Sequence, residues 1–168
     1  MRLIGIDPGS TGAVALLQDG RLLDVADTPV LRTRRGKTEK AMVNPYALHS
    51  LLRAWLPVDQ AVLEHVGGIM GQSASAAFNF GRATGMAEAA VAALGIPLDT
   101  LPPQAWRAYL KLRRGKDESR ALAVRTWPSF ADSFARVKDD GRAEAALIGW
   151  VWGRKHAGWQ RGSTDVFA

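Results

Sequence analysis

Residues 1–17 read MRLIGIDPGSTGAVALL, and this stretch decides the fold. The apolar run over 3–6 predicts a short buried strand, and Pro8-Gly9 predicts a tight turn into a second apolar run. Asp7 is therefore expected at the end of a central strand. A buried carboxylate is costly unless a cation, a hydrogen-bond donor or a metal accompanies it. Asp7 either has such a partner or caps the turn by accepting hydrogen bonds from nearby amides.

Length and composition limit the class of protein. The 168 residues fit one domain that buries about two-thirds of its unfolded surface. The chain has no cysteine, which excludes disulfides, thiolate catalysis and cysteine-ligated metals. No apolar run reaches the ~18 residues of a membrane span, and the N-terminus lacks the pattern of a secretory signal. We expect a cytoplasmic protein without membrane contact, with one domain over 1–153 and a polar C-terminal tail over 154–168.

Positive charge gathers in two segments of the chain. The net charge is +6, but residues 32–40 carry +4 and residues 107–125 carry +5, so the remainder is net −3. Two basic segments on a slightly acidic body indicate a polyanion footprint, the alternative being two solvated surface segments. The residues that we expect to contact nucleic acid are Arg32, Arg34, Arg35, Lys37, Lys40, Arg113, Arg114, Lys116 and Arg120.

The remaining pattern predicts an α/β fold. An Asp19-Gly20 hairpin turn joins the second and third strands, and a long basic loop over 28–42 follows. A helix, a strand, a helix and a strand come next, and helices end the chain; these elements are predicted over 44–55, 60–66, 73–94, 96–101, 102–112, 116–126 and 140–153. A three-strand antiparallel meander followed by alternating elements indicates one five-stranded mixed sheet with helices on both faces.

Carboxylates end two core strands and begin the last helix. Asp7 and Glu64 each terminate a strand, and Asp140 and Glu144 lie four residues apart, on one helix face. If that helix packs beside the two strands, the carboxylates converge and repel one another unless divalent cations neutralise them. Oxygen ligands without cysteine favour Mg²⁺ or Mn²⁺, and two such ions support in-line attack of water on a phosphodiester.

Each acidic residue of the last helix also has an ordinary explanation. Asp139 and Asp140 are placed to cap the helix and complement its dipole. Glu144 is compatible with a solvent-exposed helix position. Local sequence alone leaves these alternatives open.

The order and spacing of these motifs resemble RuvC-type Holliday junction resolvases. The similarity includes IGIDPG at 4–9, Leu63-Glu64 and Ala143-Glu144-Ala145. It is closer to the phage and prophage branch, through FNFGR, LGIP, PQAW and GKD, which begin at residues 78, 94, 103 and 115. The resemblance covers residues 2–153. It implies an RNase H-like fold, a homodimer and symmetric magnesium-dependent nicking of four-way DNA junctions.

Residue by residue, the resemblance assigns Asp7 and Glu64 as the first two metal ligands and Glu144 as the final acidic position. The family usually has Asp or His three residues before that last acid, where this chain has Gly141. We expect Asp140 to be the fourth ligand, because its helical offset from Glu144 is ~40°, against ~140° for Asp139. Lys116 resembles the basic residue that neutralises the scissile phosphate; otherwise it is an ordinary residue of a first helical turn.

The resemblance also implies cofactors and partners. Two Mg²⁺ ions, for which Mn²⁺ can substitute, would be held in each site by Asp7, Glu64, Asp140 and Glu144. The partners would be branched DNA and a second copy of the chain, with no small-molecule substrate. The helix over 78–93 is the expected dimer interface. The expected location is the bacterial cytoplasm, for a nucleoid-associated or phage-encoded protein.

Three other functions are compatible with parts of the sequence. The stretch over 7–12 also resembles the phosphate-binding turn of actin-like kinases and ATPases, but 168 residues leave no room for their second lobe. A nuclease of the same fold that acts on flaps, other branched DNA or RNA–DNA hybrids is a second possibility. The third is a non-catalytic junction-binding protein, because a family ligand is missing at Gly141.

Overall fold

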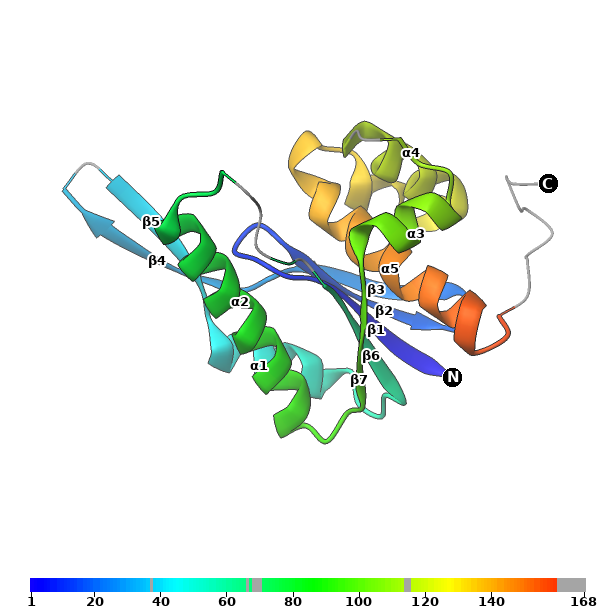
Figure 1. Cartoon of the computed structure of the whole chain (residues 1–168). Helices are drawn as coiled ribbons and strands as arrows, with labels where there is room; N and C mark the ends of the chain where they lie inside the picture. The colour runs from blue at the N-terminus through cyan, green and yellow to red at the C-terminus, as the bar shows by residue number, and fades with distance from the viewer. Residues whose placement is uncertain (37, 66, 68–70, 114–115, 160–168) are drawn as a thin grey trace.

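The computed structural model describes residues 1–36, 38–65, 67, 71–113 and 116–159, and its centre is a five-stranded sheet with the order β3-β2-β1-β6-β7 (Figure 1). Neighbours β3, β2 and β1 are antiparallel, whereas β6 and β7 continue the sheet in parallel. The predicted mixed sheet is therefore confirmed. Its strands are β1 (Arg2–Asp7), β2 (Ala13–Gln18), β3 (Arg21–Asp27), β6 (Gln60–Glu64) and β7 (Leu98–Leu101).

Two short turns fold the first three strands into a meander, as the sequence predicts. Gly9 has a φ of 134°, a conformation that few residues other than glycine adopt, and its carbonyl accepts a hydrogen bond of 3.2 Å from the Gly12 amide. The β2–β3 turn is made by Asp19 and Gly20, both with positive φ. The first turn places Asp7, the last residue of β1, opposite the first residue of β2.

Residues 28–42 do not form the predicted loop. Strands β4 (Val30–Arg35) and β5 (Thr38–Val43) pair antiparallel as a separate hairpin, which projects from the main sheet (Figure 1). Gly36, with a φ of 61°, lies in its turn. The pairing satisfies backbone polar groups while leaving the charged side chains in water, so a polar composition alone does not exclude strands.

Helices cover both faces of the sheet, as predicted (Figure 1). Helices α1 (Pro45–Ala54) and α2 (Ala74–Ala93) pack on one face, where Ile4, Ile6 and Leu63 belong to the core. Leu3 and Val62 face the other core, beneath the remaining helices. These are α3 (Pro103–Tyr109), α4 (Lys116–Thr126) and α5 (Asp140–His156), with 3-10 turns η1 (Pro128–Phe134) and η2 (Val137–Asp139) before α5.

The last helix continues past its predicted end at Gly153. Helix α5 ends at His156, and the buried Trp159 packs on Gly153 so closely that a Cβ there would lie 2.3 Å from the indole. The tail that we predict from residue 154 therefore begins with ordered, packed residues, and its part over 160–168 lies outside the described residues. None of the described helices has both the length and the apolar character of a membrane span.

Candidate active site

Helix α5 lies directly on β1 because both elements carry glycine at the contact. A Cβ at Gly5 would lie 2.0 Å from the Ala145 carbonyl oxygen and 2.9 Å from the Gly149 amide nitrogen. No larger residue fits at Gly5 without moving the helix. This backbone contact brings Glu144, which precedes Ala145, to the carboxyl ends of the central strands.

Three carboxylates from separate parts of the chain meet there. Asp7 ends β1 and Glu64 ends β6, and these strands are parallel neighbours in which Ile6 pairs with Leu63. Glu144 comes from α5. One oxygen of each carboxylate lies within 4.8 Å of the others. The structure thus brings together three of the four predicted metal ligands.

Glu64 is the most buried member of this carboxylate triad, Asp7, Glu64 and Glu144. Glu64 is 7 % exposed, and its Oε1 accepts a hydrogen bond of 2.8 Å from the indole Nε1 of the fully buried Trp106. Burial raises the pKa of Glu64; repulsion from Glu144 raises it further, whereas the Trp106 bond and the Arg107 charge oppose the rise. A cation among the carboxylates would relieve both causes of the raised pKa.

Glu144 is held by two residues of other helices. The Arg107 guanidinium forms an ion pair with Glu144 and also lies 4.5 Å above the Trp106 ring. The Ser119 hydroxyl lies 3.5 Å from the same Glu144 oxygen. Ser119 is one turn after Lys116, so the start of α4 is near the site, although the Lys116 side chain is outside the described part.

The donor set suits a hard divalent cation. All three triad residues offer carboxylate oxygens, which Mg²⁺ and Mn²⁺ prefer, and the triad combines three negative charges with one nearby guanidinium. Asp7, Glu64 and Glu144 are therefore the residues that would hold a metal ion.

The N-terminus of α5 packs against Asp7 through Gly141, the position where the family usually has a ligand. A Cβ on Gly141 would lie 2.9 Å from Asp7 Oδ2 and 2.9 Å from the Thr11 carbonyl oxygen. Within the described residues, the group of carboxylates close enough to share an ion does not include Asp140. Its assignment as the fourth ligand stays a prediction.

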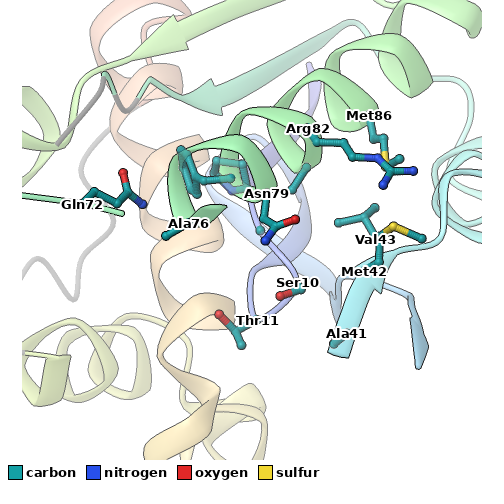
Figure 2. A pocket seen from close by; sticks show the side chains of 14 residues that line it. Ser10, Thr11, Ala41, Met42, Val43, Gln72, Ala76, Asn79, Arg82 and Met86 are labelled. Carbon is teal, nitrogen blue, oxygen red and sulfur yellow. The ribbon is translucent and has the colours of Figure 1, made fainter. Parts of the chain in front are cut away.

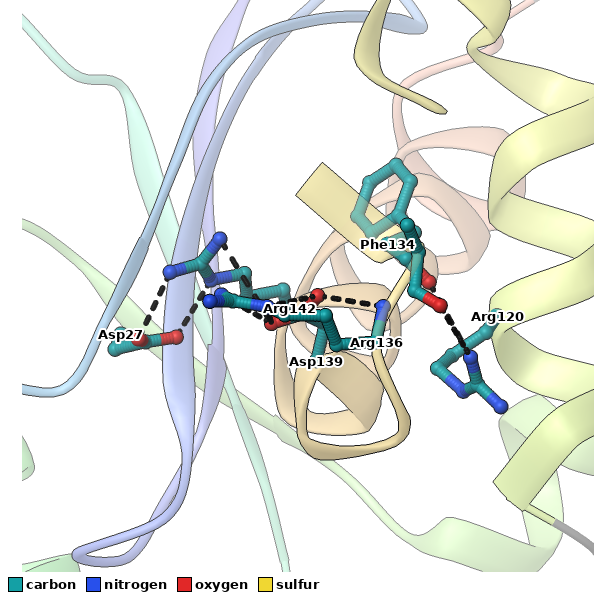
Figure 3. Close-up of polar contacts among 7 residues, drawn as sticks. Asp27, Arg120, Phe134, Arg136, Asp139 and Arg142 are labelled. Carbon is teal, nitrogen blue, oxygen red and sulfur yellow. Dashed lines mark hydrogen bonds and ion pairs between the residues drawn. The ribbon is translucent and has the colours of Figure 1, made fainter. Parts of the chain in front are cut away.

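Asp139 belongs to a network of ion pairs and hydrogen bonds with Arg136 and Arg142 (Figure 3). Its side chain is 1 % exposed and accepts hydrogen bonds from the Arg136 amide at 2.9 Å and the Arg136 guanidinium at 2.7 Å. Arg142 lies 3.9 Å from Asp139 and bonds to Asp27 of β3 at 2.8 Å. Arg136 lowers the pKa of Asp139, which stays ionised. Asp139 is the N-cap residue of α5, but its side chain makes no capping hydrogen bond to that helix. It bonds back to Arg136 instead, in the capping box of η2, so the network holds the turn that leads into α5.

Trp106 and Arg107 were not among the candidates from the sequence. The PQAW motif predicts a helix start, and a tryptophan in a short amphipathic helix is usually a core residue. Trp106 is indeed buried, but its indole N–H reaches a carboxylate. A buried indole requires an acceptor, and this is the signal that could have linked Trp106 to an acidic residue.

The predicted DNA-contacting residues fall into different environments. Arg32, Arg34 and Lys40 are exposed on the β4–β5 hairpin, and Arg113 is exposed after α3. Arg120 instead pairs with Asp117 and donates to the Ala135 carbonyl at 3.2 Å. Its bond of 3.5 Å to the Phe134 carbonyl joins α4 to η1 (Figure 3). Lys37 and Arg114 lie outside the described residues, as does the side chain of Arg35.

The sheet order, the helices on both faces and the carboxylates at the ends of β1 and β6 define an RNase H-like fold of the RuvC type. RuvC from T. thermophilus in complex with Holliday junction substrate is similar, with a TM-score of 0.63 and 16 % identity over 93 % of this chain and 96 % of that chain. A second T. thermophilus RuvC structure matches with a TM-score of 0.53 and 16 % identity, over 92 % of this chain and 96 % of that chain.

The yeast mitochondrial Holliday junction resolvase Ydc2 also shares the fold. Its TM-score is 0.50 and its identity 17 %, over 93 % of this chain and 80 % of that chain. No family model matches this chain, and no curated protein sequence does. At these identities the similarity establishes the fold of the chain.

Proposed function

We propose that this chain is a metal-dependent endonuclease that resolves four-way DNA junctions. The observation that carries the proposal is the meeting of Asp7, Glu64 and Glu144 from three separate elements. It is supported by the fold, whose similar structures include a RuvC with Holliday junction substrate. We place its action in the bacterial cytoplasm, on chromosomal or phage DNA.

The proposed site holds two Mg²⁺ ions, with Mn²⁺ as a substitute, on the carboxylate triad and Asp140. Bound ions would activate a water molecule and stabilise the charge that develops on the phosphate. Trp106 orients Glu64 through its indole N–H. Arg107, which pairs with Glu144, and Lys116, at the start of α4, would offset negative charge on the cleaved strand.

The chain itself supplies no nucleophile in this proposal. The strand is cut by water, leaving 5′-phosphate and 3′-hydroxyl ends. The exposed Arg32, Arg34 and Lys40 of the β4–β5 hairpin would contact phosphates, which fixes the position of the DNA without reading bases.

Symmetric nicking requires two sites related by a two-fold axis, which a homodimer supplies. Helix α2 is the proposed interface. Most of its first half is exposed, including Phe78 at 69 %, and its small residues would allow close approach of a second copy.

Gly141 favours a second candidate, a junction-binding protein that does not cut. The family ligand is absent there, and a Cβ at this position would press on Asp7. In this candidate, the protein binds DNA through its basic surface, while a triad without a fourth ligand holds ions too weakly for cleavage.

One assay separates these functions. The protein is incubated in Mg²⁺ with a labelled four-way junction, a flap and an RNA–DNA hybrid, and the assay is repeated with Asp7→Asn. Paired nicks in the junction, lost in the variant while junction binding persists, are the expected result. Preferred cutting of the flap or hybrid would move the assignment to a nuclease for other substrates. Junction binding without cleavage would leave the binding protein.

A further inference from the structure

A pocket of about 290 Å³ lies between the β1–β2 turn, β5 and α2 (Figure 2). One wall is the β1–β2 turn, Pro8 to Thr11, which directly follows Asp7. The other walls come from β5 and from the first half of α2. Gly141 is next to both the Thr11 carbonyl of this turn and Oδ2 of Asp7, a triad residue. The turn therefore also borders the triad, and the pocket and the triad share it as a common border.

The polar groups of the pocket suit a nucleobase edge. Figure 2 shows Asn79 and Arg82 of α2 and Ser10 of the turn around the hollow. Gln72 adds a second carboxamide. Carboxamides both donate and accept hydrogen bonds, which is how Asn and Gln recognise bases. No acidic side chain is present among the described lining residues, so nothing there repels a polyanion.

The apolar groups suit the face of a base. Met42 of β5 and Phe80 and Met86 of α2 line the same pocket. Aromatic rings stack on the flat faces of bases, and methionine sulfurs make favourable contacts with flat rings. A site for a backbone phosphate would instead gather several cations or amides, whereas Arg82 is the one cationic side chain among the described lining residues.

We propose that this pocket takes one unpaired nucleobase of the cleaved strand, next to the phosphate held at the triad. The inference rests on the proposed function and adds to it a source of sequence preference. Removing a base from the stack costs least where it is already unpaired, as at the exchange point of a four-way junction. The base would stack on the Phe80 and methionine wall and bond through its edge to Asn79.

The test combines protein variants with abasic substitutions in the junction. Abasic sites are placed one at a time at each nucleotide flanking the cut, and kcat/KM is measured for each junction. The proteins compared are the wild type, Asn79→Ala and Ala76→Trp. The tryptophan is meant to fill the pocket from the exposed start of α2. Gln18→Ala, an exposed carboxamide at the end of β2, is the matched control. Thermal melts verify that every variant folds.

We expect one position at which an abasic site slows the wild type about tenfold or more. On the intact junction, both pocket variants should have a kcat/KM about tenfold or more below that of the wild type. On the junction that is abasic at that position, the variants and the wild type should have nearly the same kcat/KM. Gln18→Ala should match the wild type throughout. In Asp7→Asn complexes, 2-aminopurine at that position should change its fluorescence on binding, and Ala76→Trp in that background should remove the change.

Two results would overturn the nucleobase role of the pocket but not the proposed function. The first is a wild type that cuts junctions with the same kcat/KM whichever nucleotide is abasic. The second is a loss of kcat/KM in the pocket variants that is equal on intact and abasic junctions. The second result would assign the pocket to the DNA backbone. Failure of the wild type to bind or cut any junction would overturn the proposed function and the pocket with it.

Discussion

The indole Nε1 of Trp106 donates a hydrogen bond of 2.8 Å to Oε1 of Glu64, and both groups are buried. Trp106 is on α3 and Glu64 ends β6, so the bond fixes the carboxylate from outside the sheet. A carboxylate that a hydrogen bond already holds in place loses less freedom when it binds a metal. Trp106 is thus a positioning residue for the triad.

Trp106→Phe should weaken metal binding, because it keeps an aromatic ring in the core but removes the donor to Glu64. We expect Mn²⁺ affinity to fall about 10-fold or more, as for other partners of metal ligands. Electron paramagnetic resonance titration of free Mn²⁺ measures this directly, without DNA. The matched control is Trp152→Phe, which removes an indole bond of 2.6 Å to Asp99. Equal losses in the two variants would assign the effect to general loosening of the core.

Glu64→Gln should stabilise the metal-free protein at neutral pH while abolishing activity. Burial and Glu144 raise the pKa of Glu64 above its usual 4.5, so the folded state binds the proton more tightly than the unfolded state. The wild-type free energy of unfolding therefore falls as pH rises from about 4.5 through the raised pKa. Glutamine keeps an acceptor for Trp106 and carries no charge, so the variant lacks this fall.

Urea denaturation in EDTA across this pH range checks the sign. The variant should exceed the wild type at pH 7 and lose its advantage in acid. Added Mn²⁺ should stabilise the wild type and not the variant, since only a ligand that binds the folded state shifts the equilibrium. A variant that is less stable than the wild type in EDTA at pH 7 would contradict the assignment.

The fold and the triad could be predicted because their signals are local and repeated. Asp7 and Glu64 each follow a short apolar strand, and parallel strands place their carboxyl ends at one edge. Glu144 required the additional inference that the last helix packs on those strands. The glycines that permit this contact, Gly5 and Gly149, have meaning only once the two elements are paired.

The β4–β5 hairpin and the role of Trp106 could not be predicted, for different physical reasons. Most of the described hairpin side chains are solvent-exposed, so burial imposes no alternation of apolar residues on its sequence. The indole of Trp106 reaches Glu64 across 42 positions of the chain, and such a contact leaves no local pattern. Asp139 and Asp140 are adjacent in sequence, but Asp139 is buried beside Arg136 and Arg142 whereas Asp140 is half-buried, a difference that local sequence does not show.

Replacing Asp139 and Asp140 separately should have opposite effects. Asp139→Asn removes the charge of a buried carboxylate that pairs with the half-exposed Arg136, and it should lower the stability of the fold at a measurable cost, with near-normal activity in the folded fraction. Because Arg136 lowers the pKa of Asp139 below 3.8, this cost is present above that pH and shrinks as the pH falls through the lowered pKa. Asp140→Asn, the proposed fourth ligand, should abolish cleavage with little change in stability.

Urea denaturation and junction cleavage on the same preparations separate the two roles. Full activity in Asp140→Asn would reduce the metal site to the triad. Loss of activity without loss of stability in Asp139→Asn would exchange the two assignments.

Gly141→Ala should disturb Asp7 directly. The added Cβ would lie 2.9 Å from both Asp7 Oδ2 and the Thr11 carbonyl, so either the helix or the carboxylate must move. We expect a loss of about 1–3 kcal/mol in stability and at least a tenfold loss in cleavage rate. Gly85→Ala is the control for stability alone, since its Cβ would meet nothing within 4 Å in the chain and alanine favours a helix. Normal Mn²⁺ binding and cleavage in Gly141→Ala would show that the site tolerates a side chain there.

Neutralising the β4–β5 hairpin should weaken junction binding through salt-dependent contacts. Arg32 and Arg34 lie two residues apart on one face of β4, and the only ion pair found for Arg32 among the described residues is an exposed one with Glu39, which contributes little to stability. In an Asp7→Asn background, Arg32→Gln with Arg34→Gln should lower the slope of log affinity against log salt by about two. Arg53→Gln on α1, also exposed, should leave the slope unchanged. An unchanged slope in the double variant would mean that these guanidinium groups are solvated surface charges, and that the DNA is held by the other basic segment.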